Sequence, residues 1–366
     1  VDEAHNALPV KLLPLAWRWM STLAEEWSCY WILASGSLVR YWALNSLRSI
    51  KMNRPHIPEL VETDLRERLM RYEHNRVSFQ WRSTPVSRRD LVRWVQSSPG
   101  PRLLILNTVQ SAAVIANDLC TAYGRECVEH LSTALTPEDR KRVIRRVANR
   151  LNDASDTNWT LVATSCVEAG VDFSFRTGFR ELSSLLSLLQ AAGRVNRHGA
   201  IQNAEMWSVS LQEDSMLKSN PALEDARNVL KGYFEKGINI TPELSTQSMN
   251  DEIVRNDSCL SEIQQLMSIE AEMQFKEVES RFNIIDSDTV CAVVDEALAK
   301  SITYGKGDWR ALQRKAISVR RYNIQRWGLK EIAKDVYQWT LGYDLFLGYM
   351  SVALQLERIK NDTLIL

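Results

Sequence analysis

The stretch from residue 159 to 199 constrains the fold most, because an apolar run, a short polar loop and a Leu-rich helical pattern follow one another in it. The run 159–164 is rich in Trp, Thr, Leu and Val, which is typical of a buried strand. The loop after this run carries Glu168, Gly170 and Asp172. The Leu-rich segment that follows predicts one helix over 180–197, with Gly199 just past its end.

Three long polar side chains lie on one stripe of this predicted helix. At 100° per residue, Gln190, Arg194 and Arg197 fall within about 60° of one another. An Arg guanidinium is always charged and its planar fork fits phosphate oxygens, so the stripe suits the γ-phosphate of a nucleotide. The alternative is a buried helix whose Arg residues reach the solvent, which two Arg residues three positions apart would favour if taken alone.

The string QAAGRVNRHG (190–199), preceded by VEAGVD (167–172), resembles motifs VI and V of superfamily 2 helicases. It is most similar to the helicase part of the type I CRISPR-associated helicase–nucleases. The resemblance implies an α/β fold with a RecA-like parallel sheet, and ATP and Mg²⁺ as cofactors. It also implies that Arg194 and Arg197 stabilise the transferring γ-phosphate and that Gln190 helps to position it. Gly170 and Asp172 would contact the nucleotide.

The first five residues, VDEAH, resemble the D-E-A-H box of the same helicases. The resemblance implies that Asp2 holds Mg²⁺, that Glu3 is the general base, and that His5 lies at the nucleotide. The alternative is a chance match that only begins a helix. About 30 residues later, WILASGS resembles motif III, which couples the nucleotide site to the nucleic-acid site, so Ser35 and Ser37 are candidate nucleic-acid contacts. Between the two motifs, residues 11–26 predict a Trp-rich amphipathic helix.

From about residue 86 onward, strand patterns alternate with helix patterns, which favours a parallel sheet covered on both faces. The predicted strands are 102–106, 127–131, 159–164 and 204–211. Thr108 is a good N-cap for a helix that Gly124 closes. Thr136 begins a capping box with Pro137 at the first helical position.

Several polar residues after these strands match positions that hold the nucleic-acid backbone in the resembling family. They are Asn107 and Thr108 in motif IV, Ser132 and Thr133 in the next loop, and Thr164 in motif V. The alternative is ordinary strand-end and cap chemistry, and the two roles are compatible because a helix cap is also an anion site. The basic run 140–150 is better explained as a solvated helix face than as a DNA contact.

The chain is expected to contain four parts: 1–85, the tail of a first RecA-like domain plus a linker; 86–211, a second RecA-like domain; 212–305, an acidic helical connector; and 306–366, a mostly helical accessory domain. In 306–335 basic residues alternate with Trp309, Tyr322 and Trp327. This mixture suits single-stranded nucleic acid, but it equally suits a domain core with its charges outside.

Some expected elements are missing from the sequence. There is no G-x-x-x-x-G-K-[ST] phosphate loop, and no His is followed by Asp as in the nuclease signature of the family. The resembling proteins carry both elements before the D-E-A-H box. We therefore expect the chain to be the C-terminal part of a longer protein, and to be inactive as an ATPase by itself.

The composition is that of an ordinary globular protein, and the formal net charge is zero, so any nucleic-acid site must be a local patch. The six Cys residues form no C-x-x-C pair, which indicates buried thiols in a reducing cytoplasm. No apolar run approaches the ~20 residues of a membrane span.

Three functions are compatible with these patterns. The first is part of an ATP-dependent helicase or translocase on single-stranded DNA, acting in type I CRISPR antiviral defence as a monomer. As in the resembling family, a guide-RNA surveillance complex would mark its target DNA. The second is a superfamily 2 RNA or DNA helicase with another role. The third is a nucleic-acid-binding remnant without ATPase activity.

Overall fold

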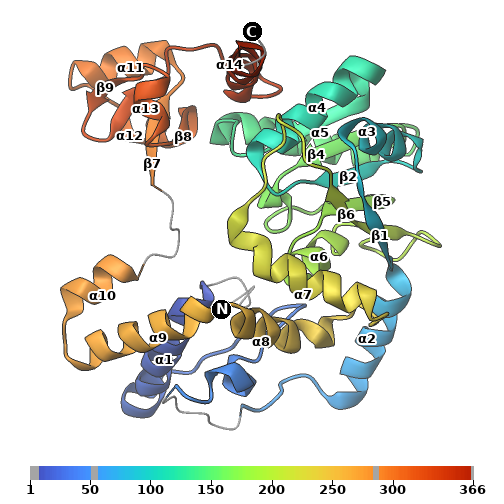
Figure 1. The fold of residues 1–366 in the computed structure, drawn as a ribbon, viewed down its shortest axis with the longest axis vertical. Coiled ribbons are helices and arrows are strands. Elements are labelled where there is room, and N and C mark those ends of the chain that lie inside the picture. Colours follow the sequence, from blue (N-terminus) through green and yellow to red (C-terminus); the bar gives the residue numbers. More distant parts are fainter. Residues whose placement is uncertain (1–7, 51–56, 283–287, 364–366) are drawn as a thin grey trace. The chain divides into compact units, whose positions relative to one another are not determined.

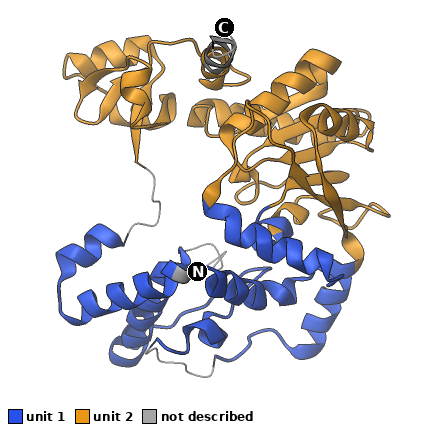
Figure 2. Cartoon of the chain, viewed as in Figure 1, with its two compact units in different colours: residues 1–74, 183–189, 222–286 blue, residues 75–182, 190–221, 287–366 orange. Residues whose placement is uncertain are grey.

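The computed structural model describes residues 8–50, 57–282 and 288–363, and it divides into two compact units (Figures 1 and 2). Unit 1 comprises residues 1–74, 183–189 and 222–286. Unit 2 comprises residues 75–182, 190–221 and 287–366. Both units are therefore assembled from segments that lie far apart in the sequence.

Unit 1 is built from helices. They are α1 (Leu13–Trp27), α2 (Thr63–Arg76), α7 (Glu224–Glu235), α8 (Ser245–Arg255), α9 (Asp257–Ala271) and α10 (Phe275–Arg281). The core of the unit joins α1 to α8 and α9 through buried residues such as Leu15, Met249 and Ile263. The Trp-rich helix expected over 11–26 corresponds to α1, which a short 3₁₀ turn precedes. The expected helical connector 212–305 contains the helices α7 to α10, but its residues Thr289–Val293 form a strand.

The centre of unit 2 is a six-stranded parallel sheet in the order β1-β6-β5-β2-β4-β3. Its strands are β1 (Ser78–Val86), β2 (Arg102–Ile105), β3 (Val128–Leu131), β4 (Thr160–Ala163), β5 (Thr177–Glu181) and β6 (Glu205–Leu211). Every residue of β2, β4 and β5 is buried, which is typical of parallel strands covered by helices on both faces. The α/β fold predicted from the alternating pattern is therefore confirmed.

Four helices connect these strands: α3 (Arg88–Ser97), α4 (Val109–Tyr123), α5 (Pro137–Asn152) and α6 (Leu185–Ala192). Both predicted caps are confirmed. The hydroxyl of Thr108 accepts a hydrogen bond from the Ser111 amide, and the hydroxyl of Thr136 accepts one from the Asp139 amide. Gly124 closes α4 with φ at +96°, a backbone conformation that favours glycine.

The prediction of a single helix over 180–197 is wrong. Residues Thr177–Glu181 form strand β5, and the helix that follows ends at Ala192. Strand β5 was missed because its sequence, TGFRE, has one large apolar side chain and no alternating pattern, and its burial comes from its place between β2 and β6. Arg194 and Arg197 consequently lie beyond the helix, so they do not share a helical stripe with Gln190.

Strand β1 was not predicted from the sequence. It pairs with β6, for example Phe79 with Met206, and forms an edge of the sheet. Its residues are mostly exposed or half-buried, and Pro85 interrupts the pattern near its end. Proline is tolerated at a sheet edge because the missing N–H need not bond to a neighbouring strand.

Residues 289–338 of unit 2 form a second sheet, of four strands in the order β8-β7-β10-β9, which the sequence analysis did not anticipate. The strands are β7 (Thr289–Val293), β8 (Ala316–Arg320), β9 (Lys330–Ala333) and β10 (Val336–Gln338). The accompanying helices are α11 (Glu296–Thr303), α12 (Trp309–Lys315) and α13 (Asn323–Arg326), whereas α14 (Met350–Thr363) packs against α4. Trp327 packs with Trp339 and Tyr349, while Trp309 and Tyr322 are exposed, so only part of the basic and aromatic set is available at the surface.

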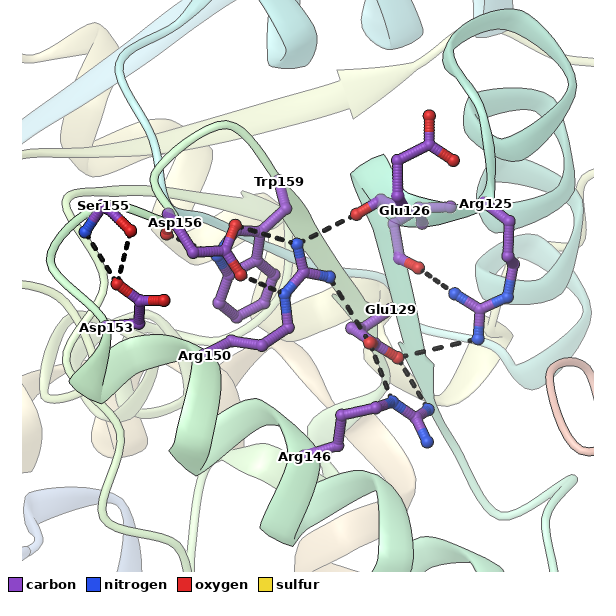
Figure 3. A network of polar contacts seen from close by, with 10 residues as sticks. Arg125, Glu126, Glu129, Arg146, Arg150, Asp153, Ser155, Asp156 and Trp159 are labelled. Carbon is purple, nitrogen blue, oxygen red and sulfur yellow. Dashed lines mark hydrogen bonds and ion pairs between the residues drawn. The ribbon is translucent and has the colours of Figure 1, made fainter.

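A buried carboxylate fastens α5 to β3 (Figure 3). Glu129 of β3 is 3% exposed and accepts two hydrogen bonds from the Arg146 guanidinium, at 2.8 and 2.7 Å. Arg150 lies 3.4 Å from the same carboxylate, pairs with Asp156 at 2.6 Å, and covers the ring of Trp159. Part of the basic run 140–150 thus stabilises the domain, which agrees with its interpretation as a helix face rather than a DNA contact.

Candidate functional site

The predicted nucleic-acid contacts of unit 2 follow three neighbouring strands at the carboxyl edge of the six-stranded sheet. Asn107 and Thr108 follow β2, Thr164 follows β4, and Ser132 and Thr133 follow β3. Because β2, β4 and β3 are adjacent in the sheet, these loops lie side by side. In open parallel sheets ligands bind at this edge, since the loops there are free to diverge from the regular structure.

The side chains of these loops differ in how far they reach the surface. Thr133 is exposed and Asn107 is half-buried, whereas Ser132 is fully buried and accepts a hydrogen bond from the Ala134 amide at 3.2 Å. Thr164 is 7% exposed, and its hydroxyl donates to the Cys166 sulfur at 3.4 Å. Ser132 and Thr164 therefore shape their loops in this structure, and Asn107, Thr108 and Thr133 are the side chains that reach the surface.

The segment 343–350 packs against the loop after β3. The hydroxyl of Tyr343 accepts a hydrogen bond from the Thr136 amide at 2.9 Å and donates one to Asp139 at 2.7 Å. The Tyr349 amide donates to the Ala134 carbonyl at 3.3 Å. The loop after β3, which carries the predicted nucleic-acid contacts Ser132 and Thr133, is thus fixed by the segment 343–350.

The segment that carries motif VI leaves helix α6 in a turn. The Arg76 guanidinium donates to the carbonyls of Ala192 and Val195, and Asn196 adopts a positive φ of 44°. A positive charge suits the carbonyl end of a helix. The Phe175 amide then donates to the Arg194 carbonyl at 2.9 Å, so the chain after α6 runs beside the end of motif V.

Arg194 is buried and its guanidinium binds the motif V loop. Its Nε donates to the Val167 carbonyl at 3.1 Å, and its Nη2 donates to the Glu168 carbonyl at 2.7 Å. The side chain is only 7% exposed. In this structure Arg194 therefore positions the backbone of motif V, which was not anticipated from its place in the predicted helical stripe.

Arg197 is an exposed arginine that pairs with another predicted nucleotide contact. Its Nε lies 2.8 Å from Asp172 Oδ1, with side-chain exposures of 39% and 77%. Its own amide donates to the Ser174 hydroxyl at 3.0 Å, which fixes the backbone. Gly170 has φ at +75° in the same loop, with open space around it. Arg197 is thus brought to the loop that carries Gly170 and Asp172. Gln190 lies in α6 and is half-buried.

The remaining predicted site residues lie elsewhere. Asp2, Glu3 and His5 lie outside the described residues. Ser35 and Ser37 belong to unit 1, where the Ser37 amide donates to the Ser35 hydroxyl at 3.1 Å and Ser37 is buried. Within the described ranges, no three His, Cys, Asp or Glu side chains gather as a metal site.

Arg180 and Glu181 are polar residues of the site that the sequence analysis missed. Both lie at the carboxyl end of β5 and are buried, at 3% and 7% exposure. The Asn107 amide donates to Glu181 Oε2 at 2.8 Å, and Arg180 Nη1 donates to Asn107 Oδ1 at 2.6 Å. A signal was present in the sequence, because two adjacent charges follow Phe179, but these two residues were assigned to the start of the helix predicted over 180–197.

In the described part of the chain, none of the helices combines the length and the apolar character that a membrane span requires.

Comparison with known proteins gives a consistent result. Residues 99–200 match the Cas3-like family described as CRISPR-associated nuclease/helicase Cas3, C-terminal. The CRISPR-associated nuclease/helicase Cas3 of Haloferax volcanii is 40% identical over 70 residues, which is 19% of this chain and 7% of that protein. The chain therefore spans a small part of the length of this curated relative.

Solved structures with the same fold cover nearly the whole chain. The structure of T. fusca Cas3 with ATP has a TM-score of 0.60 and 16% identity, and the match covers 93% of this chain and 50% of that one. A chain of a CRISPR RNA-guided surveillance complex in a pre-nicking state has a TM-score of 0.56 and 16% identity, covering 95% and 56%. At this identity the likeness concerns the fold, and it includes the RecA-like sheet. Residues 99–200 are thus similar to the C-terminal part of the Cas3-like CRISPR-associated nuclease/helicases, and the chain shares the fold of a solved Cas3 structure.

Proposed function

We propose that the chain forms part of an ATP-dependent translocase or helicase on single-stranded DNA in type I CRISPR defence. A guide-RNA surveillance complex would recruit the protein, as the solved complex suggests for its relative. The 366 residues would supply one side of the nucleotide site and one set of strand contacts. The intact protein would act in the cytoplasm, and as a monomer.

One observation carries this proposal: the loop 164–172 links the two predicted sites. It begins at Thr164 on the carboxyl edge of the sheet and reaches Asp172, which pairs with Arg197. Arg194 binds the middle of the loop through the carbonyls of Val167 and Glu168. A change at the nucleotide would therefore reach a strand-binding loop through a few direct contacts.

Arg197 is the best candidate for a contact with the γ-phosphate. An exposed ion pair such as Arg197–Asp172 contributes only about 0–1 kcal/mol, so a phosphate can replace the carboxylate as the partner of the guanidinium. Arg194 would act through the backbone of motif V in this conformation. Asp172 and Gly170 would contact the nucleotide, and Gln190 would help to position the phosphate.

ATP would supply the transferring phosphoryl group, and Mg²⁺ would neutralise charge on it. By resemblance Asp2 would hold the Mg²⁺ and Glu3 would orient or deprotonate the attacking water. Strand contacts would come from Asn107, Thr108 and Thr133, with Ser132 and Thr164 shaping the loops. Ser35 and Ser37 would contribute from unit 1.

The test is nucleic-acid-stimulated ATPase activity of the full-length gene product. We expect stimulation by single-stranded DNA, and a loss of about 10³-fold or more in turnover for Arg197→Ala, as for other arginine fingers. Arg145→Ala removes an exposed arginine of α5 and serves as the matched control, with turnover unchanged.

Normal turnover of the Arg197→Ala variant would refute the role of Arg197. Stimulation by RNA in strong preference to DNA would favour a superfamily 2 RNA helicase instead. No stimulation by either would favour a remnant without ATPase function. We also expect the isolated 366 residues to bind ATP more weakly than about 1 μM, since the phosphate loop that cradles the nucleotide is missing from this sequence.

A further inference from the structure

Four charged residues are buried together at the carboxyl edge of the six-stranded sheet. They are Glu168, Arg180, Glu181 and Arg194, with exposures of 6%, 3%, 7% and 7%. Two are acidic and two are basic, so the cluster is neutral as a whole. Buried charges are costly unless they are paired, and in this cluster Arg180 forms an ion pair with Glu168.

Arg180 lies at the centre of these contacts. Its Cα pairs with that of Ile105 in β2, so its side chain starts from the strand next to motif IV. Nη1 donates to Asn107 Oδ1 at 2.6 Å and to the Glu181 carbonyl at 3.3 Å. Nε lies 2.9 Å from Glu168 Oε1, in an ion pair with the motif V loop.

The same two loops have further ties to neighbouring residues. The Asn107 side-chain amide donates to the Leu182 carbonyl at 3.0 Å, and the Asn107 backbone amide donates to Glu181. Glu168 is held from the other side, because Arg194 donates to its carbonyl at 2.7 Å. The contacts therefore run without a break from motif IV through Arg180 to motif V and then to motif VI.

We propose that Arg180 is a positioning residue that fixes Asn107 relative to the motif V loop, so that strand binding responds to the nucleotide. The inference rests on the proposed function for the roles of Asn107 and the loop. The contacts by which Arg180 connects the loop after β2 to the loop after β4 do not depend on that function.

A guanidinium is required at this position because it reaches two partners in different directions. The planar fork of Arg180 contacts Asn107 with one nitrogen and Glu168 with another. A lysine would retain the charge beside Glu168, but its single nitrogen cannot keep both contacts in the same geometry. Arg180→Lys is thus a conservative variant that keeps the positive charge but removes the simultaneous contact with Asn107 and Glu168.

The test compares Arg180→Lys with Arg102→Lys in the full-length gene product. Arg102 is equally buried, at 1% exposure, and donates to the Ser98 carbonyl at 2.9 Å, but it lies at the opposite edge of the sheet, at the start of β2. Amide hydrogen exchange is measured at residues 106–108 and 165–168. The DNA concentration for half-maximal ATPase activity is measured beside kcat and the KM for ATP.

We expect Arg180→Lys to speed exchange in both loops, whereas Arg102→Lys leaves them unchanged. The DNA concentration for half-maximal activity should rise about tenfold, the change that corresponds to one lost hydrogen bond to a charged group. The KM for ATP should stay within about twofold, because the nucleotide contacts themselves are untouched. The DNA affinities of Arg180→Lys, Asn107→Ala and the double variant should be non-additive, since Arg180 acts through Asn107.

Unchanged exchange in the two loops would overturn the proposal, as would additive effects of Arg180 and Asn107. An equal loss of DNA sensitivity in Arg102→Lys would reduce the effect of Arg180 to general stability and would also overturn it. Absence of DNA-stimulated ATPase in the wild type would instead count against the proposed function. In that case the exchange data still decide whether Arg180 ties the loops.

Discussion

His130 and Phe346 are joined by a buried hydrogen bond across 216 positions of the chain. His130 Nδ1 donates to the Phe346 carbonyl at 2.8 Å, and His130 is 1% exposed. The Arg125 guanidinium covers the ring of Phe346 on the same side. The imidazole is neutral in this setting, since burial lowers the pKa of His130 to about 4. His130 thereby connects strand β3 of the RecA-like sheet to the segment 343–350.

The burial of His130 predicts a loss of stability in acid. Between pH 6.5 and 4 an unfolded histidine takes up a proton that the folded His130 does not, so unfolding is favoured as the pH falls. The free energy of unfolding should fall by up to about 1.4 kcal/mol per pH unit in this window, and His130 should contribute no slope above it. Denaturant titrations of wild type and His130→Asn over this range measure the difference. Parallel curves for the two proteins would show that His130 does not titrate as described.

Gly348 should not tolerate a side chain. Its φ is +63°, and a Cβ would lie 2.1 Å from the Ala134 carbonyl oxygen, in the loop after β3. Gly328 has a similar φ of +60° with open space around it, so Gly328→Ala carries the backbone strain alone, about 1 kcal/mol. We expect Gly348→Ala to cost clearly more in the free energy of unfolding, and to speed amide exchange at residues 133–136. Equal costs for the two variants would contradict the close contact between Gly348 and Ala134.

Glu129→Gln should destabilise unit 2. The substitution leaves Arg146 and Arg150 beside a neutral amide, and removing one partner of a buried ion pair is costly. Because the arginines are partly exposed, solvent screens them, and we expect a loss of about 2–3 kcal/mol in denaturant unfolding. The control is Glu138→Gln, which removes a surface pair with Arg142 and should cost less than about 1 kcal/mol. The interpretation fails if the two costs are the same.

Glu252 of α8 should contribute a pH dependence of opposite sign in unit 1. Burial raises the pKa of Glu252 to about 7, and the carboxylates of Asp225 and Asp251 add to the shift. Between pH 4.5 and 7 the folded carboxyl stays protonated while the unfolded one ionises, so stability falls as the pH rises. Glu252→Gln should therefore gain stability over wild type across this window. Glu262→Gln, an exposed change on α9, is the control without such a gain.

The parts of the fold that depend on neighbouring residues could be predicted from the sequence. Thr108 and Thr136 were assigned as caps because a cap is defined within four residues, and both hydroxyls bind the predicted turn. The strands β2, β3, β4 and β6 were also recognised, because each is a short apolar or alternating run that can be read within a few residues. Arg197 and Asp172 were each assigned to the nucleotide from their motifs, but their ion pair was not predicted, and the helix expected to carry Arg197 ends at Ala192.

The parts that depend on distant partners could not be predicted. Strand β1 is defined by pairing with β6, whose residues lie more than a hundred positions away, and its own pattern is irregular. Arg180 was missed because its importance depends on Asn107 and Glu168, which approach it only in the folded sheet. The packing of segment 343–350 on the loop after β3 likewise has no local signal.

That packing has a consequence for the order in which the protein matures. Met350, Ala353 and Leu354 belong to the same core as Ala112, Ile115 and Ala116 of α4, although more than two hundred residues are synthesised between them. Contacts of such long range form late, because the intervening chain must first be closed into a loop. During translation the six strands would be complete while one side of α4 still lacks its cover, exposed to proteases and chaperones. The loop with Ser132 and Thr133 would then take its final shape only after segment 343–350 has been synthesised, so a chain without this segment would keep its sheet but lose the order of this loop.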